Sequence, residues 1–327
     1  MRRAPPLHDS IPDFRSELPA PSAKSRETVN SIQFAEGVQR AAAEVNAIRV
    51  DENLPRFTTK KLSEVEKFAL EARKFFDITL ADQMSAKDAR AFYVICRKKI
   101  EDKGIFVLHD SFPAADGSGF CLSHKKYPVI VINTKQQTRG RRLFTLVHEL
   151  AHVLMQQTGI SDPFVRQNSV ERLCNQFAGS FLVPENYLAE LLKGTSPAND
   201  PDVDDVAWVS RRLKISQQAA VFRLEQLKIF KAGSHDKWLT IIHNSGNPDF
   251  TEKGGGSSGP PPQEKVKLAK YGFHFAQAFA PKLEQGLISE INLFRSSGLK
   301  PKYQRAYFSY AQSLTGNELQ SLELDDD

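Results

Sequence analysis

Two histidines and a glutamate lie within five residues of each other, at His148, Glu149 and His152. Helical residues four positions apart share a face, so both imidazoles can reach one metal ion. In helical H-E-x-x-H patterns the histidines bind zinc and the glutamate is the general base of a metallopeptidase. Glu149 is turned around the helix from the histidines, where it can hold the attacking water. The pattern predicts a zinc centre with Glu149 as its catalytic residue.

The residues around this motif predict a buried helix that begins near Thr138. If the match were accidental, His148 and His152 would lie on a solvated helix face. A buried helix with these polar groups and no metal would leave them unsatisfied at a high cost in free energy. The metal-site interpretation is therefore favoured. The predicted apolar stripe consists of Leu143, Leu146, Val147, Leu150, Ala151 and Leu154.

A catalytic zinc usually has three protein ligands and an open position for water. The candidate third ligand is Glu171, on a second predicted helix from Val170 to Leu182 that ends before Pro184. Glu171 could instead be an exposed carboxylate that the helix dipole stabilises at the helix N-terminus. Spacing alone supports this alternative and the metal-ligand role equally. Glu190 and Asp162 are weaker candidates.

The stretch from Gly119 to Pro184 resembles the ImmA/IrrE family of metallopeptidases. The similarity consists of a hydrophobic strand ending in Asn, then F-T-L-x-H-E-L-x-H, E-x-x-[AC]-N-x-F-A and L-x-P. This order is far more specific than H-E-x-x-H alone. The segments that carry it are Pro128–Asn133, Arg142–His152, Glu171–Ala178 and Phe181–Pro184.

The resemblance implies that His148, His152 and Glu171 bind the metal and that Glu149 is catalytic, as in a gluzincin-like enzyme. It also implies an endopeptidase that cleaves a protein partner, a transcriptional repressor or antitoxin, in a stress, phage or mobile-element response. Many family members carry an N-terminal repressor-like DNA-binding domain, and residues 1–60 contain no such pattern. Asn175 and Phe177 match recurrent family positions, for which we expect a role in positioning the Glu171 helix.

Zn²⁺ is the expected cofactor, although Mn²⁺ or Fe²⁺ can also occupy a site of nitrogen and oxygen ligands. One alternative function is a non-catalytic regulatory protein that binds DNA or a partner and keeps a structural zinc. Another is hydrolysis of a non-peptide amide. Glu149 favours catalysis, because a structural site needs no carboxylate beside the water.

The expected fold is α+β, with a small antiparallel or mixed sheet packed on zincin-like active-site helices and flanked by other helices. We expect a disordered segment at 1–28, with helical spacing from about Ser31, and a metallopeptidase core at 29–190. A helix-turn-helix-like unit follows at 200–232. The C-terminal region, 233–327, contains a Gly/Pro loop, further helices and a frayed acidic end.

The alternation and spacing of apolar residues predict the individual elements. The strand Tyr127–Asn133 could pair as an edge with an extended substrate, although its Val/Ile content supports a core strand equally well. The other predicted strands are Ile105–His109 and Gly119–Leu122. The other predicted helices are Leu62–Phe75, Ala86–Glu101 capped by Ser85, and Val266–Ser297.

The helix-turn-helix-like unit, Val203–Phe230 around Lys214–Ser216, could in principle enter a DNA groove. Its high apolar content favours packing or substrate docking, so direct DNA binding is not the preferred interpretation. The side chains that would contact DNA are Arg211, Arg212, Lys214, Gln217, Gln218 and Arg223.

Composition points to a soluble cytoplasmic protein without a membrane segment. The net charge of +5 is too mild to require an acidic partner. Three cysteines without C-x-x-C spacing suggest neither a disulfide framework nor a thiolate zinc site, and Cys174 is expected to be a small core residue. No apolar run has the length of a signal peptide or membrane span.

Overall fold

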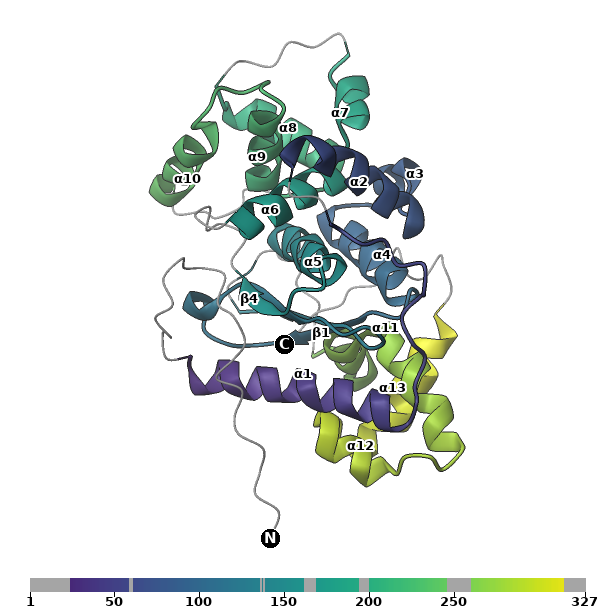
Figure 1. Ribbon diagram of the computed structural model, residues 1–327. Helices are drawn as coiled ribbons and strands as arrows, with labels where there is room; N and C mark the ends of the chain where they lie inside the picture. The colour runs from purple at the N-terminus through teal and green to yellow at the C-terminus, as the bar shows by residue number, and fades with distance from the viewer. Residues whose placement is uncertain are drawn as a thin grey trace.

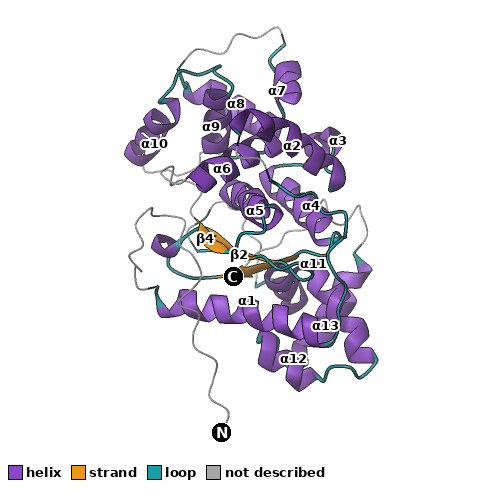
Figure 2. Ribbon diagram, in the orientation of Figure 1, coloured by secondary structure: helices purple, strands orange, loops and turns teal. Residues whose placement is uncertain are grey.

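The computed structural model describes residues 24–58, 61–135, 137, 139–161, 169–193, 200–245 and 260–314. None of the helices in these ranges is long and apolar enough to cross a membrane. Helices predominate over a small sheet (Figure 2). The helices are α1 (Arg26–Glu44), α2 (Leu62–Phe75), α3 (Leu80–Ser85), α4 (Ala89–Glu101), α5 (Arg139–Leu154), α6 (Ser169–Leu182), α7 (Glu185–Leu191), α8 (Val203–Leu213), α9 (Gln217–Gln226), α10 (Ser234–Ser245), α11 (Gln263–Glu284), α12 (Glu290–Ser297) and α13 (Pro301–Ser313).

The four described strands form one mixed sheet in the order β1-β3-β2-β4, so the α+β expectation is confirmed. Their bounds are β1 (Phe106–Asp110), β2 (Gly119–Leu122), β3 (Val129–Asn133) and β4 (Gly159–Ser161). β1 and β3 run parallel, whereas β2 is antiparallel to both β3 and β4. Because β3 has a partner on each side, the suggestion that it is an edge for substrate is wrong. Its Val/Ile content reflects complete burial.

The sheet lies between helices (Figure 1). Helix α5 packs on β2 and β3, and α4 packs on α5 and β1. On the other side α1 contacts β3, and α11 contacts β1. The apolar stripe predicted for the H-E-x-x-H helix is buried, which places this helix in the core between the sheet and α6.

Two predicted helix starts are wrong, for reasons of capping. Helix α1 begins at Arg26 because the Ser25 side chain accepts a hydrogen bond from the Thr28 amide, so residues 26–28 are helical and not disordered. Helix α4 begins at Ala89, where Asp88 and not Ser85 provides the cap. Ser85 instead ends the short helix α3, which a capping box at Thr79 starts. Residues 1–23, most of the Gly/Pro loop and the acidic C-terminal end lie outside the described ranges.

The single helix predicted from Val266 to Ser297 is wrong. Helix α11 ends at Glu284, and Ser289 caps the separate helix α12. Helix α11 is also kinked at Gly272, where φ is +78°, a value that favours glycine. At the kink the Tyr307 hydroxyl donates to the Gly272 carbonyl, and the Phe273 amide donates to Glu101 Oε2 at 2.8 Å.

A buried ion pair on α4 attaches α11 to the sheet. Arg97 Nε lies 3.5 Å from Glu101 Oε1, and both side chains are fully buried. Arg97 also donates to the carbonyls of Val107 in β1, at 2.6 Å, and of Ala269 in α11, at 2.7 Å. One guanidinium thus joins α4, the end strand of the sheet and a helix that the sequence analysis assigned to another region.

Helices α8 and α9 occupy the positions predicted for the helix-turn-helix-like unit. Lys214, between them, adopts the left-handed conformation with φ of 56°. Two of the side chains considered for DNA contact, Gln217 and Arg223, are each only 1% exposed. Arg223 donates to the Val183 carbonyl and pairs with Glu66 at 2.7 Å. These contacts of Arg223 attach α9 to α2 and to the residue after α6. Because both side chains are buried, neither is available to a DNA groove.

Buried His274 makes the unfolding free energy depend on pH. Burial against Phe106 lowers the pKa of His274 to about 4. Because this value lies below the ordinary one, stability from His274 is complete above about pH 6.5 and is lost as the pH falls toward 4. Denaturant unfolding should show that the free energy of unfolding falls by up to about 3 kcal/mol over this pH range. Much of this fall should be absent in His274→Leu. The exposed variant His243→Gln should keep the parent pH dependence, and an identical slope in His274→Leu would contradict the assignment.

Candidate metal centre

The H-E-x-x-H residues and Glu171 are brought together by the packing of α5 against α6. His148, Glu149 and His152 lie on α5, and Glu171 lies in the first turn of α6. All four side chains are completely buried. Of the weaker candidates for a third ligand, Glu190 is exposed on α7 and Asp162 lies outside the described residues.

Nitrogen and oxygen atoms from three side chains converge at one point. His148 Nε2 lies 3.2 Å from His152 Nε2 and 3.1 Å from Glu171 Oε2. His152 Nε2 lies 3.2 Å from Glu171 Oε1. Around a tetrahedral zinc with bonds of about 2.0–2.2 Å, neighbouring ligand atoms are roughly 3.3–3.6 Å apart. The observed spacing is close to this, so the three residues fit a zinc ion.

The hydrogen bond between His148 and Asn175 suits a metal ligand. His148 Nδ1 lies 2.9 Å from Asn175 Oδ1, so Nδ1–H donates to the amide oxygen. The other ring nitrogen, Nε2, lies 3.1 Å from Glu171 Oε2. The ring is therefore held with Nε2 toward the point where the three side chains converge.

The charge state of Glu171 also suits a ligand. Burial raises the pKa of this carboxyl, but the neighbouring His148 and His152 lower it by more, so the pKa lies below its ordinary value. Glu171 is therefore ionised at neutral pH. Metal ligands of this type must be deprotonated carboxylates and neutral imidazoles.

Glu149 Oε1 lies close to strand β2 of the sheet. A Cβ built on Gly119 in β2 would lie 3.2 Å from Glu149 Oε1, 2.8 Å from the Val131 carbonyl oxygen and 3.0 Å from Thr145. Only glycine leaves room for the Glu149 carboxylate at this point of β2. The sequence analysis placed Gly119 at the start of a predicted strand and missed this role.

Residues 100–225 match the family model Peptidase_M78, the IrrE N-terminal-like domain. This part of the chain is an ImmA/IrrE-family peptidase domain. The match includes all four described strands of the sheet and all four candidate site residues, and it ends within α9. Among the described helices, α1 to α3 and α10 to α13 lie outside the match.

No curated protein matches the chain significantly. Among solved structures, a chain described as a Mycobacterium tuberculosis transcriptional regulator aligns with 15% sequence identity and a TM-score of 0.33. The alignment covers 59% of this chain and 51% of that one, about half of the regulator's length. At this TM-score the likeness carries no conclusion about fold or function.

Within the ImmA/IrrE domain, two further α6 residues contact the site or its supports. Phe177 packs at tilted angles against the rings of Phe57, Phe68 and Phe181, contacts through which it can position the Glu171 helix. Cys174 lies beside the two histidines and not merely in the core, a position that the sequence analysis did not anticipate. Burial, with Glu171 and Glu149 nearby, raises the pKa of Cys174 well above its ordinary value, so the thiol is protonated without a cation.

Asn175 has a more direct role than the helix-positioning one expected from the sequence. Its hydrogen bond fixes the tautomer and orientation of His148. Loss of such a partner typically lowers metal affinity about 10- to 100-fold. We expect Asn175→Ala to weaken zinc binding by this factor in competition with a chromogenic chelator. The neighbouring variant Gln176→Ala should bind as the parent does, and unchanged affinity in Asn175→Ala would remove the proposed role.

Proposed function

We propose that the chain is a zinc-dependent endopeptidase that cleaves a specific protein partner, with His148, His152 and Glu171 as metal ligands. The observation that carries this proposal is the convergence of the two Nε2 atoms and the Glu171 carboxylate at 3.1–3.2 Å in a buried position. Three protein ligands with a carboxylate beside them are typical of a catalytic zinc, whereas structural sites have four protein ligands. The three proposed ligands have the His₂Glu composition of the gluzincin class.

Glu149 is the proposed general base. When bound, zinc supplies a Lewis acid that makes water a nucleophile at neutral pH. Glu149 accepts the proton of the attacking water and then donates it to the leaving amine of the peptide. The close approach of Gly119 to Glu149 Oε1 holds the carboxylate at one orientation, and the burial of the helix excludes bulk water from it.

The end strand β4 is a better candidate for substrate pairing than β3. Among the described strands β4 is the last in the sheet and pairs with β2 alone. It follows the H-E-x-x-H helix directly in the chain, and an extended peptide could add to the sheet by backbone hydrogen bonds along β4. Backbone pairing of this kind presents a peptide in the linear form that a protease requires.

The proposed substrate is a transcriptional repressor or antitoxin, cleaved in the cytoplasm during a stress, phage or mobile-element response. This part rests on the family resemblance of the site motifs. Three buried free cysteines are compatible with a reducing compartment. The predicted division at 232/233 stays a prediction, although contacts of α11 with β1 and α4 cross it.

Elemental analysis of the purified protein tests the ligand set. We expect about one zinc per chain in the parent and a loss of most of it in His148→Ala and Glu171→Ala, because each removes one of three ligands. Glu190→Ala, which changes an exposed carboxylate, should retain the metal. A protein that takes up no zinc even when it is supplied would contradict the peptidase proposal and leave a regulatory binding protein.

A further inference from the structure

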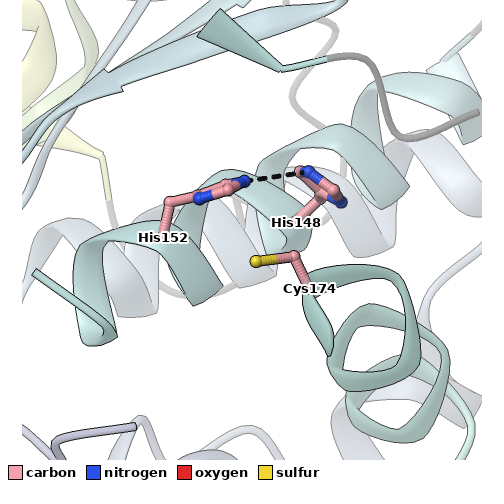
Figure 3. Close-up of side chains that lie close together, drawn as sticks. All are labelled: His148, His152 and Cys174. Atoms are coloured by element: carbon pink, nitrogen blue, oxygen red, sulfur yellow. Dashed lines mark hydrogen bonds between the residues drawn. The ribbon is translucent and has the colours of Figure 1, made fainter. Parts of the chain in front are cut away.

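Cys174 lies within reach of the same metal position as the two histidines. Its Sγ, one ring nitrogen of His148 and one ring nitrogen of His152 all lie within 4.8 Å of one another, and all three residues are buried. Figure 3 shows the thiol directed from α6 toward the two imidazoles on α5. Cys174 follows Glu171 by three residues, so both side chains project from one face of α6.

The distances allow the sulfur to become a ligand with only a small movement. For a tetrahedral zinc with Zn–S of about 2.3 Å and Zn–N of about 2.0–2.1 Å, sulfur and nitrogen are roughly 3.6 Å apart. The 4.8 Å limit exceeds this by little more than 1 Å. If the sulfur moves to the metal, the thiol loses only a weak hydrogen bond, which it donates to Met155 Sδ at 3.7 Å.

We propose that Cys174 is a sulfur ligand of the metal bound by His148 and His152, at the position that a water would otherwise take. This inference rests on the proposed function, because it requires a metal at that site. Two observations support it: the ligand atoms of the histidines lie close to the sulfur, and the buried Glu171 oxygens lie 3.1 and 3.2 Å from the Nε2 atoms of the same histidines.

Sulfur coordination changes what the site does. A bound cation stabilises the thiolate, so the thiol proton is released when the metal binds. Four protein ligands close the coordination sphere as in a structural site, which leaves no position for water. The enzyme then has a resting state, and displacement of Cys174 opens the site for substrate. A soft sulfur ligand also shifts the metal preference toward zinc and cadmium and away from manganese.

Cobalt substitution tests the proposal without an activity assay. We would add Co²⁺ to the metal-depleted full chain and record its absorption. The parent should show the visible ligand-field bands of tetrahedral cobalt and a near-ultraviolet thiolate-to-cobalt band. The thiolate band should disappear in Cys174→Ser and persist in Cys96→Ser, which changes an equally buried thiol on α4. Cadmium affinity should fall at least about 10-fold in Cys174→Ser alone.

The possible outcomes separate this inference from the proposed function. Ligand-field bands without a thiolate band in the parent would overturn sulfur coordination and leave the His₂Glu site intact. No cobalt binding in the parent would overturn both proposals. Because the decisive spectrum is that of the parent protein, the test does not depend on whether Cys174→Ser folds.

Discussion

Replacing Glu149 with Gln should lower peptide hydrolysis by about 10²- to 10⁴-fold, the usual contribution of a general base. The substitution keeps the shape of the side chain beside Gly119 but removes the group that accepts the proton. Metal content should stay at the parent level, because Glu149 is not one of the three proposed ligands. The rate can be followed with a quenched fluorescent peptide library. When the natural substrate has been identified, its cleavage can be measured in the same way.

The exposed variant Glu190→Gln is the matched control and should hydrolyse peptides at the parent rate. If Glu149→Gln loses its metal, Glu149 is a ligand and the assignment of roles is wrong. If it keeps both metal and parent activity, another group takes the proton. A variant that binds metal but does not cleave is also suited to capture the substrate, since the partner stays bound.

The second large effect concerns stability. Arg97→Met should lower the free energy of unfolding by about 3–5 kcal/mol, the cost of leaving one member of a buried ion pair without its partner. Glu101 would stay buried beside Gly272, and burial already raises the pKa of this carboxyl to about 7. The loss also includes the hydrogen bonds to Val107 and Ala269. Urea unfolding monitored by circular dichroism measures the effect.

Lys67→Met supplies the surface control. Lys67 pairs with Glu71 at 4.0 Å, with side-chain exposures of 84% and 59%, so its loss should cost less than about 1 kcal/mol. The double variant Arg97→Met, Glu101→Leu should recover part of the stability, because no buried charge is left without a partner. Equal effects of Arg97→Met and Lys67→Met would show that the buried pair does not stabilise the docking of α11.

The sequence predicted the candidate site better than the fold around it. The spacing of His148 and His152 on an apolar helix limits where the two imidazoles can point, and the resemblance identified Glu171. Cys174 was missed because its significance depends on how α6 faces α5, which spacing within α6 does not contain. The role of Gly119 was missed for the same reason, since it depends on contact between a strand and a helix.

The order of the strands also depends on long-range packing. The Val/Ile run of β3 indicated a strand, but a buried strand and an edge strand can share this composition. Strand β4 is only three residues long, so it has too few residues to produce a clear alternation. The kink in α11 was missed because its apolar pattern continues past Gly272, while the bend is set by Glu101 and Tyr307 far away in the chain.

The attachment of α11 has a consequence for protein synthesis. The hydrogen bonds from Arg97 to Ala269 and from Phe273 to Glu101 each join residues 172 positions apart. While the ribosome is still adding residues between them, the H-E-x-x-H helix has been made but the charged pair on α4 is not yet enclosed. Contacts this distant form late and slow folding. The nascent chain thus passes through a stage with exposed apolar surface, in which chaperones would bind before the metal centre is complete.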